Sequence, residues 1–359
     1  MTRTAHAVGA TRLDVLASVL LVIAAAAAMA PMLAGGAVRG GIHVSANNLR
    51  RISQACAGYE ADWNGRQWSK VTDKMMTAAG CVELAAAECP PTMVLGNDAG
   101  GSLWGFWVRG SDPECSNWPG GCNNWTVMMP MPIGGTTGSP GGEIGSWELV
   151  NARGIREYAS GRFYDPIFFA PNDVLTYPQA HQYFARTEEY PSAGTIFLSS
   201  YCLSPAAIWG TGVFRAQSQG GFQAPDEFPG AYVTPTAVMA THPSLKTRLL
   251  ERRWFQNPPS VTTPGPTGAP TSTPFHFNAG PASRPGTVFF DGHVTFVPMV
   301  DFAEADAQAL LQSGDGLWSR DTPFGERGIW SSSAIGSFWN SAHVLTTGGI
   351  TGRDLLRAQ

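Results

Sequence analysis

An apolar run near the start of the chain constrains its fold more than any other feature of the sequence. The run extends from Val15 to Val38 and contains a single serine. At about 1.5 Å per residue, a helix of this length reaches about 36 Å, which is enough to cross a hydrocarbon core of roughly 30 Å. The leader before it, MTRTAHAVG, is short and polar. The sequence therefore predicts a membrane-spanning helix.

The pattern after Val38 indicates that the helix continues beyond the membrane. Apolar residues now recur at intervals of three, four and seven, which is the period of one helix face. This face consists of Ile42, Leu49, Ile52, Cys56, Tyr59 and Trp63. Polar residues lie off the face: Asn47, Asn48, Arg50, Arg51 and Glu60. We expect one rod over residues 10–63, buried in the membrane at its start and half-buried against a domain at its end.

The segment from Gly9 to Trp63 resembles the N-terminus of type IV pilin-like proteins, specifically the pseudopilin-like proteins related to type II secretion. In that family a prepilin peptidase cuts after a glycine, and the new N-terminal residue is methylated. The resemblance implies a leader of residues 1–9, a cut after Gly9 and Ala10 as the first mature residue. The family places a carboxylate and a proline further on, where this sequence has Asp14 and Pro31.

The stretch ANNLRRISQACAGYEADWNGR, residues 46–66, is also similar to the soluble half of the family's helix. The resemblance implies assembly with copies of itself or with other pilin-like subunits. It also implies a single-pass protein of the inner membrane, with its N-terminus in the cytoplasm and its globular domain in the periplasm or outside.

Asp14 has a physical role available to it in such an assembly. A lone carboxylate in a membrane helix costs about 2.5–3.5 kcal/mol, so it usually has a partner. Cleavage after Gly9 frees the α-amine of Ala10, which is largely protonated near neutral pH. Asp14 of one subunit would neutralise this amine on its neighbour and set the axial register. The alternative is an unpaired acid at the cytoplasmic edge of the membrane, where snorkelling lowers its cost.

An ordinary secretory signal is the alternative to a retained anchor. Arg3, Arg12 and the apolar run would serve such a signal, with a cut near residues 32–34. The helical pattern continues in phase past Pro31, and this favours the anchor.

Composition limits the fold of the chain beyond the rod. Residues 64–359 are numerous enough for one large domain or two small ones. The chain has 42 glycines and 27 prolines, and only 14% of its residues are charged, which is typical of a loop-rich domain with β-strands. The Pro/Thr-rich segment 258–274 reads as an insertion within that domain. The net charge is −4 and no basic run occurs, which argues against a nucleic-acid partner.

Six cysteines bear on the compartment: Cys56, Cys81, Cys89, Cys115, Cys122 and Cys202. An exported domain meets oxidising conditions, so local disulfides between Cys81 and Cys89 and between Cys115 and Cys122 are plausible. The spacings suit no zinc ribbon, and we expect no metal site. The first cysteine lies on the apolar helix face as a small core residue, and the last has no near neighbour and is expected to be free.

The second resemblance lies near the C-terminal end of the chain, in GTVFFDGHVTFV, residues 286–297. Asp291 and Gly292 between two β-branched and aromatic runs predict a two-residue hairpin with a type I′ turn. The pilin-like family ends in a similar hairpin. Asp291 and His293 could also be read as metal ligands, but a turn residue and an exposed strand residue are the favoured interpretation.

The remaining pattern predicts an α+β fold in which the long N-terminal helix packs on an antiparallel sheet with long loops. Four strands of that sheet are expected near 164–170, 195–201, 286–290 and 293–297. Further strands are expected at 104–108 and 126–129, in a Trp-rich region. Helical patterns occur at 71–87, at 243–254 and at 303–312.

No catalytic motif is present, and neither a nucleotide-binding nor a zinc-protease signature occurs. We therefore expect no enzyme, no catalytic residue and no cofactor. Three functions stay open. The first is a pilin-like structural and assembly subunit. The second is a membrane-anchored envelope module that presents tryptophans to a polysaccharide or protein, and the third and least favoured is a secreted hydrolase.

Overall fold

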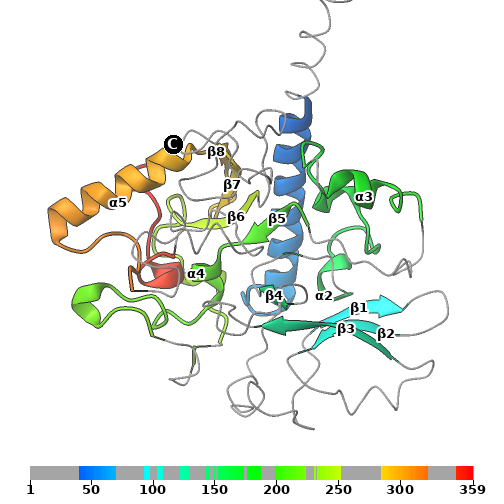
Figure 1. Ribbon diagram of the computed structural model, residues 1–359, viewed down its shortest axis with the longest axis horizontal. Coiled ribbons are helices and arrows are strands. Elements are labelled where there is room, and N and C mark those ends of the chain that lie inside the picture. The colour runs from blue at the N-terminus through cyan, green and yellow to red at the C-terminus, as the bar shows by residue number, and fades with distance from the viewer. Residues whose placement is uncertain are drawn as a thin grey trace, which may run out of the picture.

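The fold combines helices with two four-stranded sheets, in a computed structural model (Figure 1). The structure describes residues 40–69, 93–97, 103–107, 122–129, 143–145, 149, 153–173, 176–186, 199–223, 230–231, 233–251, 284–321 and 345–358. The coarse prediction of an α+β fold is confirmed. Among these residues no helix is both long and apolar enough to cross a membrane. The predicted membrane half of the rod, residues 10–39, lies outside them.

An antiparallel sheet in the order β5-β6-β7-β8 forms the centre of the domain. Its strands are β5 (Tyr201–Leu203), β6 (Thr247–Glu251), β7 (Gly286–Phe289) and β8 (Val294–Phe296). Every residue of the first three strands is buried, whereas β8 at the edge is half-buried. The two strands predicted in the hairpin are therefore confirmed, because they correspond to β7 and β8.

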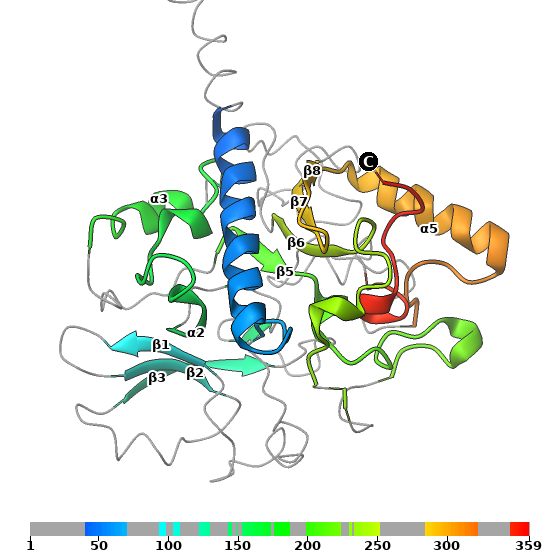
Figure 2. The same ribbon diagram turned by 180° about the vertical axis from the view of Figure 1, so that it is seen from behind.

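The N-terminal helix, residues 40–62, runs along this sheet, and α5 (Met299–Ser313) lies on the sheet's other side (Figures 1 and 2). The alternation of side chains in β7 explains the two layers. Val288 belongs to the main core cluster with Leu49 and Ile52 of the N-terminal helix, whereas Phe289 belongs to a second cluster with Phe302 of α5. The predicted helix at 303–312 is confirmed and begins one turn earlier.

The burial of the N-terminal helix follows the predicted face. Leu49, Ile52 and Cys56 are at most 2% exposed, whereas Trp63 at the end of the pattern is 55% exposed. The off-face positions include one exception, Asn48, which is buried. The predicted apolar face therefore lies against the domain, and the buried surface also includes the polar residues Ser45, Asn48 and Ser53.

The N-terminal helix ends at a left-handed pair of residues. Asn64 has φ of 54° and Gly65 has φ of 77°. The amide of Gly65 donates to the carbonyl of Glu60 at 2.7 Å, which closes the last turn as in a Schellman motif. The chain then bridges Arg66 to Thr236, so the end of the helix is tied to the loop before β6.

The second sheet has the order β1-β2-β3-β4, with β1 antiparallel to β2 and the other two pairs parallel. Its strands are β1 (Met93–Asn97), β2 (Leu103–Trp107), β3 (Cys122–Met129) and β4 (Glu143–Gly145). The strands predicted at 104–108 and 126–129 correspond to β2 and to the end of β3. The short helices are α2 (Arg153–Arg156), α3 (Tyr177–His181) and α4 (Pro205–Ile208).

Two secondary-structure predictions were wrong. Residues 164–170 contain a 3-10 helix at Pro166–Phe168 in place of a strand, because the side chain of Asp165 caps the amide of Ile167 and a proline follows the cap. The helical pattern at 243–254 is instead strand β6, which is buried on both faces. Strand β5 begins at the last residue of the strand predicted at 195–201, and residues 195–198 lie outside the described part.

The turn type of the hairpin also differs from the prediction. Asp291 does not have a positive φ, whereas Gly292 has φ of 87°. The amide of Gly292 donates to the carbonyl of Phe289 at 2.9 Å, and the amide of Phe289 donates to the carbonyl of His293 at 3.1 Å. This is a three-residue loop in which an ordinary turn is followed by one left-handed glycine. Asp-Gly supports this loop as well as the type I′ turn, since only the glycine must be left-handed.

Candidate functional site at the helix–sheet junction

The contact between the N-terminal helix and the sheet centres on Glu251, at the end of β6. Its carboxyl group accepts a hydrogen bond from Ser45 Oγ of the helix and one from the amide of Gly286 in β7, at 2.6 Å. The hydroxyl of Tyr201 in β5 lies 2.9 Å from Ser45 Oγ. All three side chains are at most 1% exposed. The helix therefore meets three strands through one buried polar relay.

Burial dominates the electrostatics of Glu251. It raises the pKa of the carboxyl group to about 7, against the opposing effect of the hydrogen bonds from Ser45 and Gly286. The nearby carboxylate of Asp173 raises it further. Among the described residues none forms an ion pair with Glu251. Burial likewise raises the pKa of Tyr201, which keeps its proton and can donate to Ser45.

Close approach of the helix at this point requires a glycine. A Cβ atom at Gly286 would lie 2.8 Å from Leu49 Cδ1 and 3.2 Å from Glu251 Cδ. Both distances are shorter than ordinary van der Waals contacts. Gly286 therefore lets the helix lie directly over the carboxyl group.

Asn48 is buried in the helix because its side chain finds hydrogen-bond partners in the domain. Its side-chain amide donates to the carbonyl of Phe169 at 3.2 Å and more weakly to that of Pro166 at 3.4 Å. The 3-10 segment that replaces the predicted strand thus offers its carbonyl groups to the helix. Asp173, just after this segment, accepts from Ser200 Oγ at 2.7 Å, which ties the segment to the start of β5.

The C-terminal half of the helix is held by an ion pair. Arg248 in the middle of β6 contacts Glu60 at 2.5 Å, and its guanidinium lies 5.7 Å from the centroid of the Phe290 ring. Burial raises the pKa of Glu60, and Arg248 opposes this. Burial also raises the pKa of the Cys56 thiol nearby, so Cys56 is an unreactive core residue, as predicted.

A second buried polar cluster joins the start of β6 to the C-terminal segment. Lys246 Nζ lies 3.1 Å from Asp354 Oδ1, and neither side chain is exposed. Lys246 also donates to Thr346 Oγ1 at 2.7 Å, and Asp354 accepts from the amide and the hydroxyl of Thr247 at 2.7 and 2.5 Å. Burial lowers the pKa of Lys246, and Asp354 opposes this. Residues 345–358 are thereby fastened to the sheet.

The predicted hairpin residues lie at the surface. His293 Nδ1 is 2.5 Å from Asp291 Oδ1, and the imidazole stacks on the Phe289 ring with 4.4 Å between centroids. Asp291 is thus a turn residue, the interpretation that the sequence favoured, whereas His293 directly precedes β8 and is half-buried. Within the part of the chain that the structure describes, no three side chains of His, Cys, Asp or Glu gather as metal ligands.

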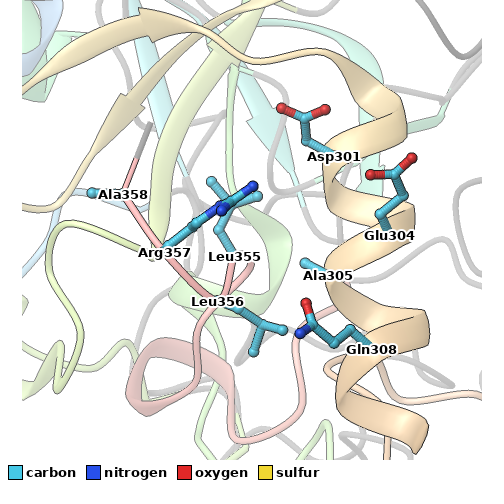
Figure 3. Close-up of a pocket in the computed structure, with 8 residues that line it drawn as sticks. All are labelled: Asp301, Glu304, Ala305, Gln308, Leu355, Leu356, Arg357 and Ala358. Carbon is cyan, nitrogen blue, oxygen red and sulfur yellow. The ribbon is translucent and has the colours of Figure 1, made fainter.

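A pocket of about 660 Å³ lies between α5 and the C-terminal segment (Figure 3). Asp301 and Glu304 project from α5 at one end, and Arg357 extends across from the other wall. Leu355 and Leu356 supply apolar surface. The pocket is removed from the N-terminal helix and contains none of the residues that the sequence analysis selected.

Most of the predicted site residues lie outside the described residues. These are the processing and assembly positions Gly9, Ala10, Asp14 and Pro31, and the cysteines Cys81, Cys89 and Cys115. Cys122 is in β3, and its predicted disulfide partner lies outside. Cys202 is buried and is not in a disulfide, as expected, and its thiol donates to the carbonyl of Leu250 at 3.4 Å.

Sequence reasoning missed the buried polar residues. Lys246 had the clearest signal, since it is one of only three lysines and sits between leucines in the stretch LKTRLLE. Glu251 ends the same stretch. Their partners Asp354 and Ser45 lie 108 and 206 positions away in the chain, and nothing local marks them.

The junction has the character of a structural joint. Ser45, Tyr201 and Glu251 are buried, so a substrate cannot reach the relay while the helix is in place. We compared the chain with known proteins: no family model matches it, and neither does any curated protein or solved structure.

Proposed function

We propose that this chain is a pilin-like (pseudopilin) structural subunit, which is anchored in the inner membrane by its N-terminal segment and polymerises through it. The observation that carries the proposal is the N-terminal helix, whose apolar face packs along an antiparallel sheet. The same periodic face was the basis of the rod predicted from sequence.

The outer face of the helix fits a rod that remains accessible to partners. Asn47, Arg50, Arg51 and Gln54 are exposed on the side away from the sheet. In the proposed assembly this face is available to neighbouring subunits, while the membrane half supplies the main contact. Asp14 pairs there with the freed amine of a neighbour's Ala10.

The structural joint also supports a role other than catalysis. Its polar groups form hydrogen bonds that hold the helix and the C-terminal segment against β6. Such contacts would hold the exported domain firmly on the helix of an anchored subunit. The proposed partners are prepilin peptidase, other pilin-like subunits and the inner membrane.

The test is the mature N-terminus of protein isolated from its native membrane. Intact mass and N-terminal analysis are expected to show loss of residues 1–9 and a methylated Ala10. Gly9→Leu is expected to block this processing, whereas Ala34→Leu, the matched control, leaves it unchanged. A mature chain that begins after residue 34 would identify a secretory signal and refute the proposal.

Assembly is tested separately from processing. Asp14→Asn is expected to preserve cleavage and membrane insertion but to abolish crosslinking between subunits through single cysteines placed in the membrane half. Unchanged crosslinking in Asp14→Asn would remove the proposed pairing. Crosslinking that is absent in the parent protein would leave an anchored module that does not polymerise.

A further inference from the structure

The buried carboxyl group of Glu251 is the strongest unexplained chemical feature of the described residues. It lies at the end of β6, directly beneath the N-terminal helix, and accepts from Ser45 Oγ and from the amide of Gly286. The facing groups from each packed element are Ser45 of the helix, Tyr201 of β5, Gly286 of β7 and Asp173 after the 3-10 segment. Of these groups, Asp173 is also a carboxyl group, and it disfavours a negative charge on Glu251.

An ionised carboxylate at this position is costly. Hydrogen bonds from a hydroxyl and an amide offset part of the lost hydration, but a buried charge also needs a counter-charge. Among the described residues Arg248 is engaged with Glu60 and Lys246 with Asp354. Neither is in an ion pair with Glu251.

The relay of hydroxyl groups can serve both protonation states while the helix is docked. With the carboxylate ionised, Tyr201 donates to Ser45 and Ser45 donates to Glu251. With the carboxyl group neutral, Glu251 can donate to Ser45, and Ser45 to Tyr201. The hydrogen bonds therefore remain possible in both protonation states. The two states differ in the free-energy cost of keeping a negative charge on Glu251 away from water.

We propose that Glu251 is a proton-controlled latch, which holds the N-terminal helix against the sheet when it is neutral and loosens the helix when it ionises. The helix covers the carboxyl group through Ser45 and Leu49. Displacement of this helical segment admits water to the charge, so ionisation favours the loosened state. The inference concerns the joint itself and does not depend on the pilin-like function.

The sign of the effect follows from linkage. A docked Glu251 titrates at about 7, against an ordinary value of 4.5 for the exposed group. Between these values the docked state holds a proton that the open state has released, so rising pH favours opening. The opening equilibrium changes by up to about tenfold per pH unit in this window and levels off above it.

Hydrogen–deuterium exchange of the full chain tests the latch. Protection factors, which divide out the intrinsic pH dependence of exchange, are measured for amides of residues 40–62 between pH 5.5 and 8. We expect protection to fall by about tenfold or more with rising pH. The amides of α5 on the other side of the sheet serve as an internal reference and are expected to change much less.

Two variants separate the latch from general pH effects. Glu251→Gln resembles the neutral carboxyl group and is expected to remove most of the pH dependence of protection, with the remainder due to Glu60, whose pKa is also raised by burial. Glu60→Gln, which removes a carboxyl group from the same helix, is the matched control and is expected to keep the pH dependence. A wild-type helix whose protection is constant with pH, or a Glu251→Gln variant with an unchanged pH dependence, would overturn the proposal.

A direct titration keeps the test decisive if Glu251→Gln does not fold. Carboxyl-carbon NMR of wild-type protein labelled at glutamate reports each ionisation, and pH-dependent shifts of residues in contact with Glu251 assign the signal. A midpoint near 7 supports the latch. A midpoint near 4.5 contradicts it, because the docked and open states would then bind protons equally.

Discussion

A buried carboxyl group lies at each end of β6, one from a distant segment and one from the strand itself, and the two differ in the groups that stabilise them. At the start of the strand, Asp354 from the C-terminal segment meets the cation of Lys246 and the hydroxyl and amide of Thr247. At the end, Glu251 meets one hydroxyl and one amide, with no cation among the described residues. In the first arrangement a cation balances the charge of the carboxylate. In the second, the proposed latch, docking of the helix depends on the protonation of Glu251.

The middle of the strand provides a third case. Arg248 and Glu60 form an ion pair whose side chains are 7% and 12% exposed, between the helix and the sheet. Water therefore shares in stabilising the charges. The three sites along one strand therefore differ in exposure and in the available counter-charge.

The largest effect is expected from removal of the buried cation. Lys246→Met leaves Asp354 buried and unpaired, and we expect a loss of about 3–5 kcal/mol in the free energy of unfolding. Urea denaturation measures this loss, with Arg50→Met on the exposed helix face as the control. A loss below about 1 kcal/mol would show that Asp354 does not depend on its counter-charge, and would break the contrast with Glu251.

The pH dependence of stability gives the next effect. The pKa of Glu251 is raised from 4.5 to about 7, so the folded state retains its proton across this window while the unfolded chain loses it. The free energy of unfolding is therefore expected to fall by about 2–3 kcal/mol as pH rises from 4.5 to 7 and to level off above. The measurement is the difference between wild type and Glu251→Gln in urea titrations at several pH values. Parallel curves for the two proteins would contradict it.

Removal of the hydroxyl between Glu251 and Tyr201 gives a smaller effect. Ser45→Ala takes a donor from the carboxyl group and a partner from the phenol, and we expect a loss of about 1–2 kcal/mol. The titration midpoint of Glu251 should rise, because the Ser45 hydrogen bond lowers its pKa. Ser53→Ala on the same helix is the matched control. A stability loss without a shift of the midpoint would indicate a packing role alone.

The smallest effect is expected at the centre of the strand. A double-mutant cycle with Arg248→Met and Glu60→Gln should give a coupling energy of about 1 kcal/mol, since the pair is partly exposed and water screens it. Thermal denaturation of the four proteins provides the measurement. A coupling as large as the loss in Lys246→Met would show that partial exposure does not weaken the Arg248–Glu60 pair, and would contradict the contrast with Lys246 and Asp354.

Local pattern was sufficient for elements that place most of their apolar residues on one side. The helix at 40–62 buries the periodic residues Leu49, Ile52 and Cys56, and it was predicted. The helix α5 was also predicted, although Leu310 and Leu311 are exposed. The strands β7 and β8 were predicted because β-branched and aromatic residues flank Asp291 and Gly292. In these segments the type of secondary structure can be predicted from residues that are close together in the sequence.

Strand β6 was missed because neither of its faces is exposed to solvent. All five of its residues are buried, so the alternation of polar and apolar residues that marks a half-exposed strand is absent. Leu245, Leu249 and Leu250 instead imitate the spacing of a helix. The 3-10 helix at 166–168 was missed for a related reason, since its apolar residues are buried in an irregular segment whose carbonyls bind Asn48.

Local patterns in the sequence were enough to predict a rod with one apolar face, a hairpin with a glycine in its turn, and a chain in which charged residues are scarce. The groups of polar residues that are buried together became visible in the folded structure alone. Ser45, Tyr201 and Glu251 meet from three distant parts of the chain, and Lys246 meets Asp354 from two. A charged or polar side chain can be buried where other groups bond to it. Those groups come from distant parts of the chain, so no local pattern in the sequence marks them.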